Sequence, residues 1–236
     1  MKTHVRVLVI GGGVVGVSTL YHLVKKGWAD VALIERTELT AGSTWHAAGL
    51  LPLFNMSYTV GQLHKYSVDL YKRLPAETGQ DTSFHVTGNL RLATNKQRMD
   101  EYQKYCGTAN TIGVPFEVIT PKRVKELWPL AELGGSPDTP AIVGALYHPD
   151  DGHIAPADLT MALRKGARAG GAEIYEHTEA TAIERTGAGE WLVHTSKGDI
   201  TAEHLVFATG NYARQTGKLV GINVPAIPVE DRKSVV

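Results

Sequence analysis

The chain has 236 residues, enough for one large domain or two small ones with a substantial hydrophobic core. Its 24 basic side chains balance 24 acidic ones, which argues against nucleic acid or an anionic membrane as the main partner. A single cysteine, Cys106, excludes an internal disulfide framework and a zinc site built from several thiolates. With no secretory signal before the first apolar run and no apolar stretch of about 18 residues, we expect a soluble, cytoplasmic protein.

The first elements predict a β-α-β unit. The β-branched run from Val5 to Ile10 is typical of a strand buried in a parallel sheet. Apolar residues at helical spacing follow from Val14 onward, and Gly27 is a candidate for the end of that helix. A second buried strand is predicted over Val31–Ile34.

The turn between the first strand and the helix carries a dinucleotide-binding pattern. Its glycines would allow a tight turn, let the backbone approach a pyrophosphate and let the helix pack closely on the strand; they are Gly11, Gly13 and Gly16. Phosphate would bind the helix N-terminus at Val14 and Val15. Glu35 lies about 20 residues beyond the last glycine, where a carboxylate holds ribose hydroxyls, and its charge disfavours NADP. This pattern alone leaves NAD and FAD open.

A second turn of small residues follows Glu35 and Arg36. Its hydroxyl groups could cap a short helix that carries the next residues; the segment is Gly42, Ser43, Thr44, Trp45, His46 and Ala47. Two helix N-termini close together fit the extended pyrophosphate of FAD better than a nicotinamide dinucleotide. We therefore predict FAD, with an NAD-binding module as the weaker alternative.

These segments resemble the FAD-dependent amine oxidoreductases of the D-amino-acid-oxidase superfamily, and within it the dimethylglycine and sarcosine dehydrogenases. The resemblance rests on GGGVVG, on Glu35 and above all on GSTWHAAGL at 42–50. It covers residues 4 to 230 and continues through ETG at 77–79, TGNLRLAT at 87–94, DGHIAPADLTMAL at 151–163 and ATGNYA at 208–213.

The resemblance implies that His46 bonds covalently to the 8α-methyl carbon of the isoalloxazine ring. Neutral imidazole supplies the lone pair that such a bond needs. This histidine also favours an enzyme over a regulatory homologue that lacks it, whereas Trp45 is either an aromatic wall beside the flavin or a core residue. The further cofactor contacts that the resemblance implies are Arg36, Gly49, Leu50, Ala180 at the adenine end, and Gly210.

The remaining periodicity predicts alternating helices and strands. Helices are expected over 57–76, stopped near Pro75 and Gly79, over 95–111, after the cap Thr120–Pro121, and over 156–169. Strands are expected at 84–86, 89–94, 116–119, 141–148, 172–177, 179–185, 191–196 and 204–210. Arg91 could meet a substrate carboxylate, but we expect it on the solvent side of its strand. We interpret 150–153 as a turn, with no metal site.

These expectations add up to an α/β fold: a Rossmann-like FAD-binding domain with an inserted mixed α/β substrate domain, truncated at the C-terminus. The FAD-binding domain is predicted over 1–80 and 151–230, and the substrate domain over 81–150. In the resembled family the segment after VPAIPVE supplies active-site groups, so the catalytic residues are expected beyond Glu230. We interpret 231–236 as a non-native tail on a truncated gene.

The resemblance implies oxidation of a small N-methyl amino acid by hydride transfer to a covalently bound flavin, which yields an iminium. Dimethylglycine is the first expectation, and sarcosine or another secondary or tertiary amine is the second. The competing hypothesis is a non-catalytic regulatory homologue of the same fold. Oxygen and an electron-transfer flavoprotein are both open as electron acceptors, and tetrahydrofolate would intercept the iminium if the intact protein carries a folate-binding domain.

Overall fold

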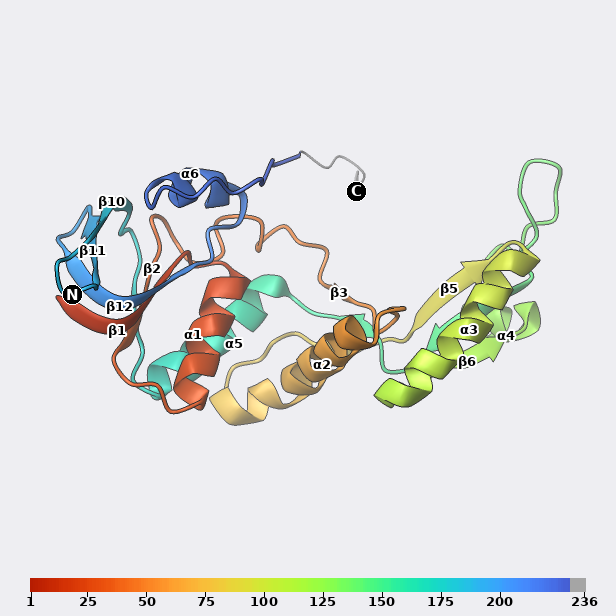
Figure 1. Ribbon diagram of the computed structural model, residues 1–236. Helices are drawn as coiled ribbons and strands as arrows, with labels where there is room; N and C mark the ends of the chain where they lie inside the picture. The colour runs from red at the N-terminus through yellow and green to blue at the C-terminus, as the bar shows by residue number, and fades with distance from the viewer. Residues whose placement is uncertain (230–236) are drawn as a thin grey trace. The chain divides into compact units, whose positions relative to one another are not determined.

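The computed structural model describes residues 1–229 and divides the chain into two compact units (Figure 1). Unit 1 consists of Met1–Ala48, Leu74–Thr82 and the described residues from Pro156 onward, and unit 2 consists of Gly49–Arg73 and Ser83–Ala155. Residues 49–73 therefore lie in unit 2, whereas the sequence placed them in the FAD-binding domain. The tail predicted at 231–236 lies outside the described residues.

Among residues 1–229, six strands form the sheet of unit 1, in the order β10-β11-β12-β1-β2-β9. Their bounds are β1 His4–Ile10, β2 Val31–Ile34, β9 Glu173–Tyr175, β10 Ala180–Arg185, β11 Trp191–Thr195 and β12 Ile200–Phe207. The strands from β12 to β9 run parallel, and β10 and β11 add an antiparallel hairpin at one edge. Such a mostly parallel sheet is the dinucleotide-binding architecture that the sequence predicted.

The helices of unit 1 cover this sheet. They are α1 Val14–Lys25, α5 Pro156–Ala169, the 3-10 turn η1 Gly210–Tyr212 and α6 Ala213–Lys218. Figure 1 shows α1 and α5 side by side. Their contact depends on glycine, because a Cβ at Gly166 would lie 2.7 Å from the Tyr21 ring. The buried side of α1, which includes Val17 and Leu20, follows the helical spacing read from the sequence.

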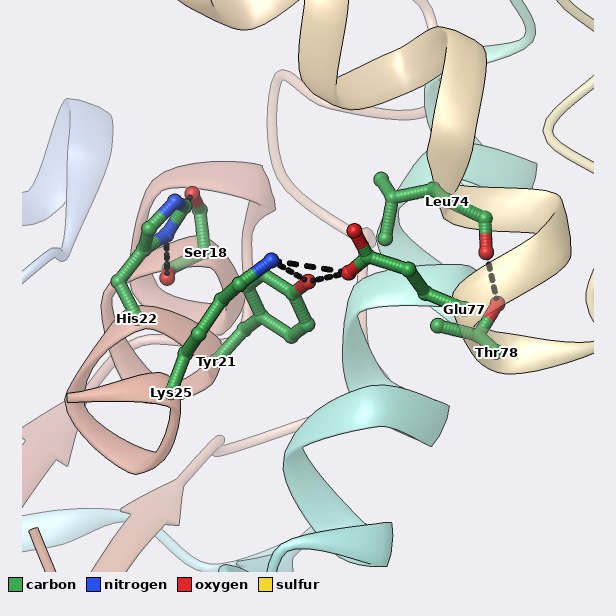
Figure 2. Close-up of polar contacts among 7 residues, drawn as sticks. All are labelled: Ser18, Tyr21, His22, Lys25, Leu74, Glu77 and Thr78. Carbon is green, nitrogen blue, oxygen red and sulfur yellow. Dashed lines mark hydrogen bonds and ion pairs between the residues drawn. The ribbon is translucent and has the colours of Figure 1, made fainter. Parts of the chain in front are cut away.

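The last turn of α2 (Tyr58–Thr78) belongs to unit 1 and is joined to α1 by three side chains. Tyr21 Oη donates to Glu77 Oε2 at 2.6 Å, and Lys25 Nζ donates to the same carboxylate oxygen at 2.9 Å and to Tyr21 Oη at 3.1 Å. Figure 2 shows these side chains converging from the two helices. Burial, and then the bond to Glu77, raise the pKa of Tyr21.

Helix α2 includes Pro75 and ends at Thr78, directly before Gly79. A proline removes one N–H from the helix, but the residues after it still donate, and the helix continues to Thr78. It ends where Gly79 adopts φ +63° and donates to the carbonyl of Pro75 at 2.8 Å. The end predicted near Pro75 and Gly79 is therefore confirmed, and it is Gly79 that ends the helix.

The described residues of unit 2 form two small antiparallel sheets and two further helices. The sheets have the orders β5-β7-β6 and β3-β8-β4. The bounds are β3 Leu50–Leu51, β4 His85–Val86, β5 Asn89–Ala93, α3 Lys96–Ile112, β6 Glu117–Ile119, α4 Pro121–Leu127, β7 Gly144–His148 and β8 Gly152–His153. Thr120 caps α4 through its side chain, as predicted, and Asn95, predicted as the first residue of its helix, caps α3 in the same way.

Two expectations for unit 2 were wrong. Gly152 and His153 form a strand instead of completing a turn, because they pair with β3 on one side and β4 on the other. Arg91 turns inward: its guanidinium carbon lies 4.4 Å from the centre of the Phe54 ring, and its Nε is buried. Alternation along β5 places Arg91 and Leu90 on opposite faces of the sheet. The face of Arg91, which we expected to meet solvent, is the one that α3 covers.

Candidate cofactor-binding site

The glycine turn between β1 and α1 is packed too tightly for any side chain. Gly11 has φ +115°, and a Cβ there would overlap the carbonyl oxygen of Ala208. A Cβ at Gly16 would overlap the carbonyl oxygen of Gly11. The strand, the turn and the helix therefore approach one another at backbone distance, which is the arrangement expected of this pattern.

Thr44 completes the N-terminus of α1. Its Oγ1 accepts a hydrogen bond from the backbone N–H of Val14 at 3.0 Å, and only 8% of Thr44 is exposed. A Cβ at Gly13 would lie 3.2 Å from the same hydroxyl oxygen. Thr44 thus lies at the N-terminus of α1, where we predicted that phosphate binds, and it caps that helix.

The second helix predicted for this region does not form. Residues 39–46 make consecutive turns, in which Thr40 adopts φ +71° and Trp45 N–H donates to the Thr40 carbonyl. Thr44, a predicted cap of this helix, accepts from the Val14 N–H of α1 instead of from a residue that follows it. The prediction of two converging helix N-termini was wrong, because within residues 11–46 the helix N-terminus is that of α1.

Glu35 is held in place at the end of β2. Its Oε2 accepts from the N–H of Gly12 at 2.6 Å, and its Oε1 accepts from the N–H and the hydroxyl of Thr37 at 2.9 and 3.1 Å. Both carboxylate oxygens are therefore oriented beside the glycine turn. A carboxylate at this corner of a dinucleotide-binding fold accepts hydrogen bonds from ribose hydroxyls.

Two segments distant in sequence complete this corner. The Thr178 N–H donates to the Glu35 carbonyl at 2.7 Å, and Ala180 begins β10 two residues later. On the other side, Asn211 Nδ2 donates to Ser43 Oγ at 3.2 Å. The candidate residues of unit 1 from both halves of the chain therefore lie around one glycine turn.

The sequence analysis missed Asn211 and Tyr212. The guanidinium carbon of Arg36 lies 3.8 Å from the centre of the Tyr212 ring, a cation–π contact that holds Arg36 beside Glu35. Asn211 and Tyr212 come directly after 208–210, just past the end of β12, and this position could have marked them as candidate site residues. Gly210 itself has φ +51° and open space around its Cβ position, so its backbone conformation explains the glycine.

His46 and Trp45 both lie on the surface. Trp45 is 63% exposed, which rules out the core alternative for its indole. The two rings meet edge to face with their centroids 4.9 Å apart. No hydrogen bond from the described residues engages the His46 imidazole, so its ring nitrogens are accessible. Gly42 and Ser43 are exposed nearby, whereas Gly49 and Leu50 belong to unit 2.

These residues fit the adenosine diphosphate half of FAD. The glycine turn admits a close ligand, α1 presents its positive end, and Glu35 presents two oriented oxygens. Glu35, Arg36, Ser43 and Thr44 would hold this half of the cofactor. Among residues 1–229, no three His, Cys, Asp or Glu side chains are grouped to hold a metal ion, and no helix is long and apolar enough to cross a membrane.

Comparison with known proteins agrees with this geometry. Rat dimethylglycine dehydrogenase is 42% identical over 229 residues, which cover 97% of this chain and 26% of that protein. The formaldehyde-forming 4-methylaminobutanoate oxidase of Paenarthrobacter nicotinovorans is 38% identical, over 98% of this chain and 27% of its own length. The crystal structure of L-proline dehydrogenase from P. horikoshii superposes with a TM-score of 0.85 at 30% identity, over 94% of this chain and 57% of that one.

The chain spans about a quarter of the length of these two curated relatives. The family model for DAO, the FAD dependent oxidoreductases, matches residues 6–236. This match confirms the resemblance seen in the sequence and the cofactor that it implied. The chain therefore belongs to the FAD-dependent oxidoreductase family.

Proposed function

We propose that this chain contributes the FAD-binding part of an enzyme that oxidises small N-methyl amino acids, dimethylglycine foremost. The main observation behind this proposal is that the imidazole of His46 is exposed, two residues after Thr44, which caps the N-terminus of α1. Support comes from the similarity to rat dimethylglycine dehydrogenase and to the 4-methylaminobutanoate oxidase.

In this proposal the residues of unit 1 bind and orient. Glu35 would accept hydrogen bonds from the ribose hydroxyls, and the backbone from Gly11 to Gly13 would bind the pyrophosphate. Arg36, held by its contact with Tyr212, would lie beside the adenosine. Bound FAD would supply the hydride acceptor for the carbon next to the amine nitrogen. The amine must be neutral, because an ammonium has no lone pair to stabilise the iminium that forms, and hydrolysis of that iminium releases formaldehyde.

We also propose that His46 carries the flavin covalently. The test is to precipitate the holoprotein with acid and measure flavin absorbance in the pellet. We expect a yellow pellet from the wild type and from His204→Ala, which alters another exposed histidine of unit 1. We expect a colourless pellet and free flavin in the supernatant from His46→Ala. A pellet that stays yellow after His46→Ala would overturn the covalent assignment.

The substrate is tested by adding dimethylglycine to the purified holoprotein without oxygen. Loss of the flavin absorbance near neutral pH supports the proposal, and stronger bleaching by sarcosine would reassign the substrate. No bleaching by any N-methyl amino acid, with flavin present, would favour the regulatory homologue. Reoxidation by air or by an electron-transfer flavoprotein then identifies the acceptor, and a fall in released formaldehyde with tetrahydrofolate would show that folate intercepts the iminium.

A further inference from the structure

Two histidines face each other across neighbouring strands of unit 2. His85 on β4 and His153 on β8 are direct partners in an antiparallel register. Directly opposed residues point to the same face of a sheet, with Cβ atoms about 4.5–5.5 Å apart. Both side chains are exposed, and their ring centroids lie 5.2 Å apart. The next residue in this row is Leu50 on β3, which is 66% exposed.

The backbone around the pair fixes its spacing. A Cβ at Gly152 would overlap the carbonyl oxygen of His85, so only glycine lets β8 approach β4 this closely. The Asp151 carbonyl accepts from the N–H groups of Thr87 and Gly88 at 3.1 and 2.8 Å, which holds the end of β4. On the opposite side, Asp151 Oδ1 accepts from the Leu53 N–H at 2.9 Å, beyond the end of β3.

This spacing is the one that a shared metal ion requires. Two imidazoles bound to one tetrahedral ion at the usual Zn–N distance of about 2.0–2.1 Å have ring centroids about 5 Å apart. Neither ring makes a hydrogen bond or ion pair with the residues that the structure describes. Imidazole is a borderline ligand suited to zinc, copper and nickel, and it does not suit magnesium or calcium.

We propose that His85 and His153 form a binding site for a divalent transition-metal ion, with water in the remaining positions. The site differs from the cofactor site because all of its protein ligands lie in unit 2. A bound ion would join β4 to β8 across the sheet and stabilise the folded chain in proportion to its concentration. Because only two protein ligands bind the ion, its other coordination positions stay open to water. In structural zinc sites, by contrast, protein ligands fill all four positions.

The test is titration of the tag-free, metal-stripped protein with Zn²⁺, Ni²⁺ and Cu²⁺ by calorimetry. We expect one site, with Cu²⁺ binding more tightly than Ni²⁺ or Zn²⁺ as the Irving–Williams order requires. Either His85→Gln or His153→Gln should abolish the binding signal, since each removes one of the two protein ligands and leaves a single imidazole. The matched control is His194→Gln, which changes a histidine already bonded to Asp199 at 3.0 Å and should leave binding unchanged.

Thermal unfolding gives an independent readout. The midpoint should rise with Zn²⁺ in the wild type and in His194→Gln, and should stay constant in both pair variants. Unfolding curves without metal show whether those variants fold. We expect wild-type stability, because both side chains are exposed. Undiminished binding to a His85→Gln/His153→Gln double variant would overturn the proposal, as would the absence of binding to the wild type.

Discussion

Thr44 Oγ1 accepts a hydrogen bond from the Val14 N–H at 3.0 Å, across a separation of 30 residues. Through this contact the segment that carries His46 is attached to the first turn of α1. The N-cap residue of that helix, Gly13, has no side chain to do so. One hydroxyl group therefore links helix stability to the position of the proposed flavin attachment site.

Replacing Thr44 by valine should lower the free energy of unfolding by about 1–2 kcal/mol. Valine has nearly the same shape but leaves the partly buried Val14 N–H without its partner. Thr44→Ser keeps the oxygen and should be much closer to the wild type. Urea unfolding monitored by circular dichroism measures the difference. Equal stabilities for the valine and serine variants would show that the hydrogen bond contributes nothing.

Glu35→Ala should weaken FAD binding by about tenfold, equivalent to 1.4 kcal/mol, because it removes the proposed ribose acceptor. It also leaves the N–H groups of Gly12 and Thr37 without their acceptor, so the turn should become less ordered. Glu38→Ala changes an exposed carboxylate nearby and serves as the control. Flavin fluorescence during titration with FAD gives both dissociation constants when each change is made in a His46→Ala background, which keeps binding reversible. Indistinguishable values would reject this role of Glu35.

Alanine at Gly11 or Gly16 should prevent FAD binding and destabilise unit 1 by more than about 2 kcal/mol. Each new methyl group would overlap a carbonyl oxygen, and at Gly11 the positive φ adds strain. Gly187→Ala is the matched control, because a Cβ there meets nothing within 4 Å and the backbone has no positive φ. Thermal unfolding and FAD titration should separate these variants clearly. A wild-type-like Gly16→Ala protein would contradict the tight packing described here.

Asp151 should make stability depend on pH. Burial raises the pKa of its carboxyl group from 3.8 to about 6, against the opposing effects of the Leu53 N–H and Arg91. The folded protein then keeps a proton that the unfolded chain has already lost. The resulting stabilisation is complete below about pH 4 and is lost as the pH rises to about 6, by about 1–3 kcal/mol.

The comparison is with Asp151→Asn, which keeps an oxygen to accept from Leu53 but does not titrate. The difference in unfolding free energy between variant and wild type should change by that amount from pH 4 to pH 7, in favour of asparagine. Denaturant titrations at half-unit pH intervals measure it. Parallel pH profiles for the two proteins would show that the Asp151 carboxyl titrates normally.

Tyr21→Phe should lower the free energy of unfolding by about 0.5–1.5 kcal/mol, because it removes the hydroxyl that bridges Lys25 and Glu77 (Figure 2). Adding Glu77→Gln should cost less in this background than in the wild type, since the two residues share one network. A double-mutant cycle measured by urea unfolding gives the coupling. Strictly additive effects would mean that the three side chains act independently.

The first β-α-β unit was predictable from the sequence because its signals are local. Buried strands, helical spacing and glycine positions all lie within residues 5–34, and Glu35 follows directly. The family match added His46 as the candidate attachment site. The contacts that fix Glu35 were not predictable, since they join it to Gly12 and to Thr178, far apart in the chain.

The errors have a common physical origin in tertiary contacts. Periodicity shows that Arg91 and Leu90 lie on opposite faces of β5, but it does not show which face another element covers. Ser43 and Thr44 have the composition of a helix cap, and the helix that Thr44 caps is α1, 30 residues earlier. Gly152 and His153 look like a turn until two further strands are placed beside them.

The pairing of β1 with β12 has a consequence for biosynthesis. His4 lies opposite Thr201, so β1 waits at the ribosome for a strand that is made 201 − 4 = 197 residues later. Until then one edge of β1 exposes unpaired backbone groups, which are prone to association with other chains. The cofactor pocket therefore cannot be completed before β12 has been made, and nascent chains arrested before β12 should depend on chaperones and remain free of flavin.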